Sequence, residues 1–424
     1  MSIATTCLWM ILACTDKDTG STQDSGTPIT DADTDTDTDT DTDTDPWPAE
    51  SACEGSEAAW TEGVAYPTVQ AAIDAAATGG EVIVCPGSWG SARIDRDLTL
   101  RGQAGSDAVY LDAAGLGSSL VIDAQAVAVV EGLTLTGGIG THVGGVLAGG
   151  GLYIEKDAQV SLVDVQVRAN SAERGGGMYI ENTITSMQDV IIDGNSASDG
   201  GGMYLHAVYD GGIDIDATAG LTVTGNVATR GGGLMGHCDD CSYPGVLVFG
   251  GVFESNDAVD GGGMYVDGNG RFAHNFELTD ARLVGNTATN GGGAYEATDY
   301  GMLSLTRVEI VDNVATQEGG AVHYTEGVFL DECVLTHNSA GVRGGGLAGR
   351  ASGLTTLANT VLQSNTAPVA GGFAVPDIGT VQLESVDVGT GSTANDPDDV
   401  AGSGSYDWDG VVSGTCTFAA CTVK

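Results

Sequence analysis

The feature that most restricts the fold of this chain is a short phrase that recurs eight times from about residue 160 onward. Each copy has an apolar residue, two variable residues, Asn, one variable residue, Ala, and a glycine pair six and seven positions after the Asn. Successive copies lie 25 to 31 residues apart. A unit of this length cannot bury an apolar face alone, so the pattern predicts stacked repeats that share one core. The repeated asparagines are Asn170, Asn195, Asn226, Asn256, Asn286, Asn313, Asn338 and Asn365.

The apolar residues within one copy predict short strands rather than helices. In the copy around Asn313, Leu303 and Leu305 form one alternating pair, and Val308 and Ile310 form a second pair after two polar positions. A further pair often follows the glycines. Alternation with a period of two is the mark of a strand with one buried face. Three short strands separated by corners make one turn of a triangular coil, and the glycine pairs argue against helices.

Each fixed residue has a physical role at a corner of this coil. Stacked coils place equivalent residues about 4.8 Å apart, so we expect the asparagine amides to hydrogen-bond to one another in one internal row. The alanine suits a corner too tight for a longer side chain. The glycine pair is expected to supply positive φ angles, which other residues adopt only at a cost.

These motifs resemble those of a known group of proteins. The sequences Ile192-Asp-Gly-Asn195 and Gly201-Gly-Met-Tyr204 are similar to the repeat of polymorphic outer-membrane proteins and, more broadly, to right-handed parallel β-helix proteins of the pectin-lyase-like superfamily. The resemblance covers roughly residues 66–390. It implies an all-β, right-handed parallel β-helix with a surface setting. The resemblance also implies that an amphipathic helix over residues 66–77 covers the first coil. From the repeat we expect a single solenoid of about eleven coils over roughly residues 81–390. We therefore assign residues 51–390 to the β-helix with its N-terminal cap, and residues 391–424 to a small C-terminal cap.

The first fifty residues predict export. Residues 1–14 have the form of a signal peptide, and Ile11-Leu12-Ala13-Cys14 resembles the bacterial lipobox, in which the cysteine is acylated. The alternative is an ordinary signal peptide that is cleaved elsewhere. Residues 15–50, rich in Asp and Thr, predict an extended acidic linker. No later segment reaches the roughly 20 apolar residues that span a bilayer, so Cys14 is the expected membrane attachment of an outer-membrane or cell-surface lipoprotein.

The charge of the chain excludes some partners. The formal net charge is −44, and Lys and Arg together number only 14. Such a chain cannot neutralise a nucleic-acid backbone, nor can it dock on anionic lipid through a basic patch. We expect a monomer whose partner is a polysaccharide or a surface protein.

The nine cysteines of an exported chain predict disulfides. Cys416–Cys421 would close the C-terminal cap, and Cys53–Cys85 would join the entry segment to the first coil. Cys238 and Cys241 stand beside His237, where a metal site is an alternative, but we favour a loop disulfide and predict no metal site. Cys333 occupies a position that is apolar in other copies, which predicts a buried thiol.

Two columns of equivalent residues are candidates for chemistry. Six residues before the asparagines, Asp280, Arg307 and Glu332 follow one another on adjacent coils. Polysaccharide lyases of the resembled superfamily use calcium-binding carboxylates and a basic residue, so this group could act in the same way. We favour a solvent-exposed ladder of alternating charge, and so predict no catalytic residue and no cofactor, with calcium as the one ion considered.

The second column lies nine residues after the asparagines, between two inward-facing positions, so it should face outward. It is rich in tyrosine, and stacked exposed tyrosines would suit sugar rings or a partner protein. The alternative is an aromatic ladder that only stabilises the sheet. The tyrosines are Tyr179, Tyr204, Tyr265 and Tyr295, with Tyr153 at the matching place one coil earlier.

Three classes of function remain open at this point. The first is a non-enzymatic surface protein with an adhesive or structural role, which the repeats, the linker and the anchor favour. The second is a polysaccharide lyase or hydrolase, which the expected fold permits but no residue group supports. The third is a carbohydrate-binding module without catalysis.

Overall fold

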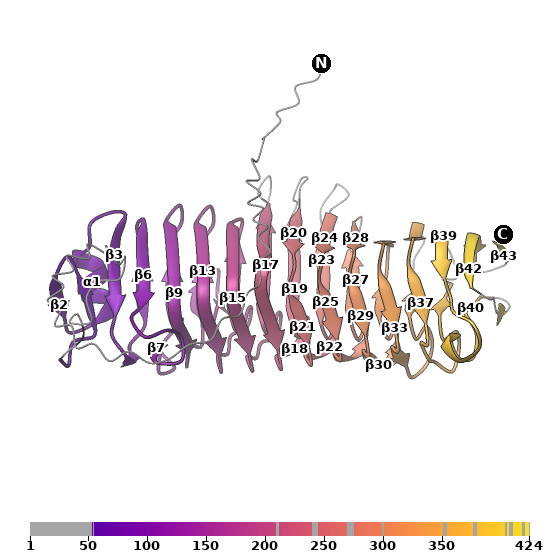
Figure 1. Cartoon of the computed structure of the whole chain (residues 1–424), viewed down its shortest axis with the longest axis horizontal. Helices are drawn as coiled ribbons and strands as arrows, with labels where there is room; N and C mark the ends of the chain where they lie inside the picture. The colour runs from indigo at the N-terminus through magenta and orange to yellow at the C-terminus, as the bar shows by residue number, and fades with distance from the viewer. Residues whose placement is uncertain are drawn as a thin grey trace, which may run out of the picture. The chain divides into compact units, whose positions relative to one another are not determined.

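The computed structural model describes residue 53 and residues 55–423, apart from 209–211, 240–244, 269–274, 299–300, 351–353, 376–379, 403–404, 407–409 and 418–419. The predicted signal peptide with Cys14, the whole predicted linker (residues 15–50) and Cys241 lie outside the described residues. The predicted fold class is confirmed. Strands of successive coils stand side by side along the body, from β3 at the indigo end to β39 at the yellow end (Figure 1).

The largest sheet has 23 strands and takes two successive strands from many of the coils, so it forms two faces of the coil that meet at a corner. Leu303, Leu305 and Ile310 on its strands, and Val308 between two of them, are all buried, as the alternation predicts. Its strands are β1 (Ala59–Thr61), β2 (Val64–Tyr66), β3 (Gly80–Val84), β4 (Gly87–Trp89), β6 (Leu98–Gly102), β7 (Val109–Asp112), β9 (Val127–Thr136), β13 (Gln159–Arg168), β15 (Ile184–Asp193), β17 (Ile213–Thr224), β20 (Val246–Phe249), β21 (Val252–Glu254), β24 (Asn275–Thr279), β25 (Arg282–Val284), β28 (Met302–Thr306), β29 (Glu309–Val311), β32 (Val328–Asp331), β33 (Val334–Thr336), β36 (Leu354–Ala358), β37 (Val361–Gln363), β39 (Thr380–Asp387), β42 (Val411–Thr417) and β43 (Cys421–Val423).

A second sheet, of 13 strands, carries the tyrosines discussed below. Its strands pair in parallel from coil to coil, except for the last one. They are β5 (Ala92–Ile94), β8 (Leu120–Ile122), β12 (Leu152–Ile154), β14 (Met178–Glu181), β16 (Met203–Val208), β19 (Leu234–Asp239), β23 (Met264–Gly268), β27 (Ala294–Thr298), β31 (Val322–Tyr324), β35 (Leu347–Gly349), β38 (Phe373–Ala374), β40 (Val400–Ala401) and β41 (Ser405–Tyr406).

The third face holds a sheet of five short strands that directly follow the repeated asparagines. These strands are β18 (Val227–Arg230), β22 (Asp257–Asp260), β26 (Thr287–Asn290), β30 (Val314–Glu318) and β34 (Ser339–Ala340). A separate antiparallel hairpin of β10 (Thr141–Val143) and β11 (Val146–Ala148) lies between β9 and β12 in the sequence.

Each turn of the coil bends at residues with a left-handed backbone. One lies six residues before the asparagine, as at Asp280 (φ 56°), and another lies directly before it, as at Ser255 (φ 55°). The third is the glycine that precedes the glycine pair, as at Gly231 (φ 63°). The expectation that the pair itself supplies the positive φ is therefore wrong for most copies. A Cβ on Gly232 would lie 2.5 Å from the Gly262 carbonyl oxygen of the next coil, so the pair is required by close backbone approach.

The repeated asparagines form one buried row along the axis. In each step, the carboxamide oxygen of one asparagine accepts from the backbone N–H and the side-chain NH₂ of the asparagine one coil earlier. For example, Asn256 Oδ1 accepts from Asn226 N and Nδ2, both at 3.0 Å. The row has a ninth member that the repeat pattern did not include, Asn395, which accepts from Asn365 at 3.1 Å. The row thus satisfies buried polar groups coil by coil while holding adjacent coils in register.

Antiparallel pairs occur at both ends of the described body, where a parallel stack would leave open strand edges. At the start, β1 pairs antiparallel with β2 and β3, and helix α1 (Val69–Ala75) packs Val69, Ala72 and Ile73 into the core. Thr68 caps this helix by accepting from the Ala71 N–H at 3.1 Å. At the other end, β42 pairs antiparallel with β39 and with β43. Among the described residues, no helix has the length and hydropathy needed to cross a membrane.

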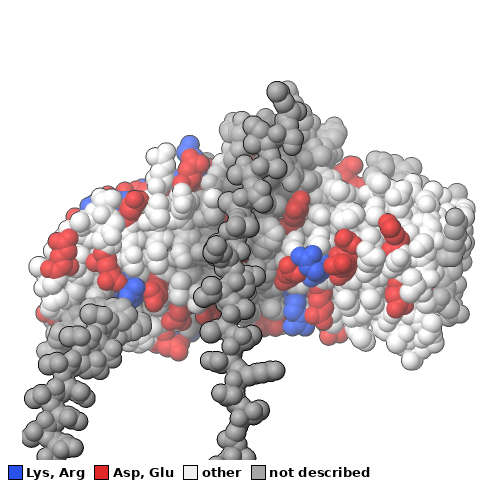
Figure 2. Space-filling model, turned by 45° about the horizontal axis from the view of Figure 1, so that its top comes forward, with Lys and Arg blue, Asp and Glu red and all other residues white. Residues whose placement is uncertain are grey.

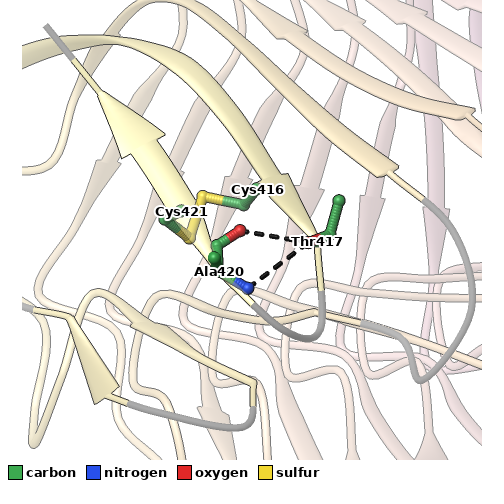
Figure 3. The surroundings of a disulfide bond; sticks show 4 residues. All are labelled: Cys416, Thr417, Ala420 and Cys421. Carbon is green, nitrogen blue, oxygen red and sulfur yellow. Dashed lines mark hydrogen bonds between the residues drawn. A yellow bond between two sulfur atoms is a disulfide. The ribbon is translucent and has the colours of Figure 1, made fainter.

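Two disulfides join described cysteines, Cys53–Cys85 and Cys416–Cys421. The second lies in the β42–β43 hairpin, where the Thr417 hydroxyl also donates to the Ala420 carbonyl oxygen (Figure 3). Cys238 is disulfide-bonded, and its predicted partner Cys241 lies outside the described residues. Cys333 is a buried free thiol, and burial raises its pKa to about 11.

Candidate functional site

The five predicted tyrosines stand in one column on the outer side of the 13-stranded sheet. Tyr153, Tyr179 and Tyr204 are direct partners on adjacent strands, and Tyr265 pairs with Tyr295. The expectation that they are exposed is wrong, since the first four keep only 4%, 3%, 1% and 8% of their accessible surface. Figure 2 shows Asp and Glu spread over one side of the described body, with Lys and Arg scarce and mostly beside acidic groups.

Two contacts account for the burial of the tyrosine column. Rings of neighbouring coils pack against one another, and those of Tyr179 and Tyr204 are nearly parallel, with 5.3 Å between the ring centroids. Arginines from the adjacent corner then cover them, with Arg174 5.5 Å above the Tyr204 ring and Arg230 5.7 Å above the Tyr265 ring. Burial raises the pKa of the tyrosine hydroxyls. The column is therefore an aromatic ladder, a second core outside the coil.

A shift of register changes how the column ends. The pairing of β26 with β30 is irregular between Ala288 and Asn290, so the later strands move by one residue relative to the repeat. As a result His323, rather than Val322, pairs with Tyr295. Its imidazole continues the stack at a centroid distance of 4.5 Å. His323 lies ten residues after Asn313 rather than nine, so the spacing rule could not assign it to the tyrosine column.

A polar column lies beside the tyrosines, at the corner before the glycines. Its members are direct neighbours on successive coils and alternate mostly between positive and negative charge. Arg230 forms a bidentate pair with Asp199, with both N–O distances at 2.8 Å. We call this set the charged column, and it consists of Arg174, Asp199, Arg230, Asp260, Asn290, Glu318 and Arg343.

One end of the charged column forms a tight ionic group. The Glu318 carboxylate lies 3.2 Å from both Arg343 and Arg350, and 3.4 Å from Nε2 of the buried His323. The contact with His323, together with Arg350 and Arg343, lowers the pKa of Glu318 although burial opposes this shift. Burial lowers the pKa of His323, so its ring is neutral at pH 7. Glu318 therefore acts as the ionised acceptor that holds two arginines over this end of the column.

On the opposite side of the tyrosines, two histidines and two aspartates form a connected network. His206 on β16 pairs with His237 on β19, and His237 pairs with Asp267 on β23. The Asp239 carboxylate lies 3.1 Å from His206 Nε2 and 3.3 Å from His237 Nε2. The Nδ1 atoms face away, toward the Tyr179 hydroxyl at 2.6 Å and toward the Asp267 carboxylate.

The network shifts the pKa values of its members in different directions. Burial lowers the pKa of His206. Burial also lowers that of His237, but the hydrogen bond and charge of Asp267 outweigh it, so the net shift is upward. For Asp239, burial raises the pKa while the contacts with His206 and His237 lower it, and the net shift is downward. Asp239 is therefore ionised at neutral pH between two imidazoles.

These polar residues were not among the sequence-predicted site residues. The available signal was positional, because His206 and His237 both lie eleven residues after their asparagines. A search for residues that are close in sequence, such as Cys238 and Cys241, gives no indication of the histidine–aspartate network. The contribution of Asp239 depends on the register of two neighbouring coils, which becomes visible only in the structure.

The residues of the group Asp280, Arg307 and Glu332 lie on adjacent coils, at the corner between two strands of the large sheet. Arg307 donates to Asp280 at 2.6 and 2.8 Å, and both side chains are about half exposed. Asp280 raises the pKa of Arg307, so the guanidinium keeps its proton and cannot serve as a base. The arrangement is an exposed ion pair of low energetic weight.

Comparisons with known proteins add little to this geometry. No family model matches the chain, and no curated protein matches it. A solved structure, ORF18 of Geobacillus virus E2, is similar at 12% identity with a TM-score of 0.36, covering 76% of this chain. This chain spans 58% of that one. A likeness of this degree carries no argument about function, so the chain is assigned only to the class of parallel β-helix proteins.

Proposed function

We propose that this chain is an exported surface protein that binds a neutral polysaccharide along its 13-stranded sheet and does not cleave it. The observation that carries the proposal is the charged column beside the tyrosine column. It places half-buried Arg, Asp and Asn side chains at one position of each successive coil, over a rigid aromatic base.

The repeat of this column suits a polymer that lies along the axis. Coils stack about 4.8 Å apart, so an extended chain would meet a new donor or acceptor at every step. Arginine and carboxylate side chains both form paired hydrogen bonds with neighbouring hydroxyl groups. Because the tyrosine rings are covered, contact would run through Arg174, Asp260 and the edge of Tyr295 rather than through stacking on Tyr179 or Tyr204. The tyrosines predicted as ligand-binding thus serve mainly as its support.

The charge of the protein favours a neutral ligand. With a formal net charge of −44, the surface repels acidic polymers such as pectin at moderate salt. This distinguishes the proposal from a polysaccharide lyase, whose substrates are uronic acids. We also infer kinship with the pectin-lyase-like superfamily and attachment to the membrane through Cys14, supported by the sequence resemblances alone.

Affinity electrophoresis of the full chain against neutral and acidic polysaccharides tests the proposal. We expect retardation by at least one neutral polymer, unchanged in EDTA and without release of products. Arg174→Ala combined with Asp260→Ala should weaken the retardation at least about tenfold, which corresponds to about 1.4 kcal/mol. Arg282→Ala is the matched control, because Arg282 is an exposed, ion-paired arginine on the large sheet.

Two results would contradict the proposal. One is that no neutral polymer retards the protein, and the other is that Arg282→Ala weakens retardation as much as the double variant does. Cleavage of an acidic polysaccharide that is lost in Arg307→Ala would instead establish the lyase alternative.

A further inference from the structure

Three potential metal ligands meet on the outer side of the 13-stranded sheet. His206, His237 and Asp239 each offer one ligand atom, and these atoms all lie within 4.8 Å of one another. Their side chains are partly accessible, at 14%, 19% and 44% of the full exposed area. A cation from solvent could therefore reach them, while the surrounding protein still restricts their movement. We call these residues the His–Asp cluster.

The fold brings the cluster together through strand register. His206 and His237 are direct partners on parallel strands, so their rings stack at a centroid distance of 5.5 Å. Asp239 lies two residues after His237 on the same strand and so on the same side of the sheet. Between them, Cys238 points into the core, is fully buried and is disulfide-bonded. This inward anchor holds the backbone that carries two of the three ligands.

The other nitrogen of each imidazole is already engaged. His237 Nδ1 bonds to the Asp267 carboxylate, which also binds Arg230 at 3.2 Å. His206 Nδ1 bonds to the Tyr179 hydroxyl at 2.6 Å. Histidine ligands of metals commonly make such outer contacts, because they fix the ring orientation and present the second nitrogen to the ion. Both Nε2 atoms here are turned toward the same carboxylate.

We propose that His206 Nε2, His237 Nε2 and the Asp239 carboxylate bind one zinc ion. Tetrahedral zinc with bonds of about 2.0–2.1 Å places its ligand atoms about 3.3 Å apart. His206 Nε2 lies 3.1 Å from Asp239 Oδ2 and His237 Nε2 lies 3.3 Å from Asp239 Oδ1, so each imidazole nitrogen stands at about this distance from one oxygen of the carboxylate. Two imidazoles favour Zn²⁺ over Ca²⁺ and Mg²⁺, which prefer oxygen ligands. Three protein ligands leave a coordination position open to water or to another ligand.

The site does not depend on the proposed polysaccharide binding. The Arg174 and Asp260 variants used above change no zinc ligand, and binding there is expected to persist in EDTA. Failure of either proposal therefore leaves the other standing.

Calorimetric titration of the untagged full chain with ZnCl₂ tests the site. Excess Ca²⁺ in the buffer occupies the many exposed carboxylates, so that weak unspecific binding is suppressed. We expect one tight site per chain. His237→Ala and Asp239→Asn should each weaken it at least about 100-fold, whereas His142→Ala, which removes an exposed histidine on β10, should leave it unchanged. Asp267→Asn, which alters only an outer contact, should weaken it about 10–100-fold.

A measurement on the unaltered protein guards against variants that fail to fold. Co²⁺ in place of zinc should give the intense visible absorption of a tetrahedral nitrogen–oxygen site, and equimolar Zn²⁺ should abolish it. Octahedral carboxylate sites absorb only weakly. Absence of a calorimetric site above the calcium background, a site unaffected by Asp239→Asn in a folded variant, or a weak octahedral spectrum would each overturn the proposal.

Discussion

The asparagine row makes a quantitative prediction about one side chain. Asn256 is fully buried and takes part in four side-chain hydrogen bonds. Its oxygen accepts from Asn226 N and Nδ2, and its NH₂ group donates to the Val223 carbonyl oxygen at 2.9 Å and to Asn286 Oδ1 at 3.0 Å. Leucine has a similar shape but can make none of these bonds. The substitution Asn256→Leu therefore isolates the polar contribution at an almost constant volume.

The magnitude follows from the groups that lose their partners. The Asn226 backbone N–H has no other acceptor in the row, and the Asn226 NH₂ group keeps only its bond to the Ile192 carbonyl oxygen. Asn286 Oδ1 still accepts from the backbone N–H of residue 256. Two buried donor hydrogens are thus left unsatisfied, each at a cost of about 1–3 kcal/mol. We expect Asn256→Leu to lower the free energy of unfolding by about 2–6 kcal/mol.

The assay has to resolve local as well as global stability, because long repeat arrays can unfold in parts. Thermal unfolding followed by circular dichroism gives the global effect, and amide hydrogen exchange at Asn226 gives the local one. The matched control is Asn290→Leu. Asn290 is half-buried and donates one bond to Asp260, and its Oδ1 has no hydrogen-bond partner among the described residues, so the expected loss is below about 1 kcal/mol. Equal stability of the Asn256→Leu protein and the unaltered protein, with unchanged exchange at Asn226, would refute an energetic role for the row.

Two further predictions concern the anchor and the Glu318 group. Cys14→Ser should move the protein from the membrane fraction to the soluble fraction, because acyl chains on Cys14 are the proposed attachment; continued sedimentation with membranes would contradict the lipobox interpretation. Glu318→Gln should destabilise the protein by about 1–3 kcal/mol at pH 7, since it removes a charged acceptor of two arginines. The folded pKa of Glu318 is lowered, so its contribution is fully present above the unfolded value of about 4.3 and is lost as the pH falls toward the folded pKa. The difference in melting temperature between the two proteins should therefore shrink below about pH 4, and a constant difference would contradict this assignment.

The fold could be predicted because the features that determine it, apolar alternation and the spacing of corner residues, repeat along the sequence. Alternating apolar pairs such as Val308 and Ile310 specify which side of a strand is buried, and this signal recurs in most copies. The asparagines and glycines mark the corners at nearly constant spacing. The pattern did not reveal why the glycine pair is required. A side chain at position 232 would clash with the backbone of Gly262 on the next coil, and these residues are thirty apart in sequence.

The exposure of the tyrosines could not be inferred from alternation alone. The alternation of apolar residues predicts that Tyr204 points out of the coil, and this is correct. The alternation does not predict that Arg174 covers the Tyr204 ring or that the Tyr179 ring packs against it. These contacts come from a neighbouring corner and a neighbouring coil. A side chain on the outer surface of a solenoid can therefore be as buried as one in its core.

Chemistry on this fold is arranged along the axis rather than along the chain. His206 and His237 are 31 residues apart in sequence, yet they are adjacent strand partners.

The inward positions pack in the core and the corner positions belong to the asparagine row, so both repeat from coil to coil. The outward positions are free to differ from coil to coil. Some residues change the character of an outward column without weakening the core, such as His206 and His237, which lie two positions beyond Tyr204 and Met235. Stability alone does not account for such residues, so they are candidates for function. A single extra residue in β30 is enough to place His323 in the tyrosine column, which shows how strongly the content of a column depends on register. For a chain of this class, candidate sites are best sought by aligning the coils on their asparagines and reading each outward column in turn.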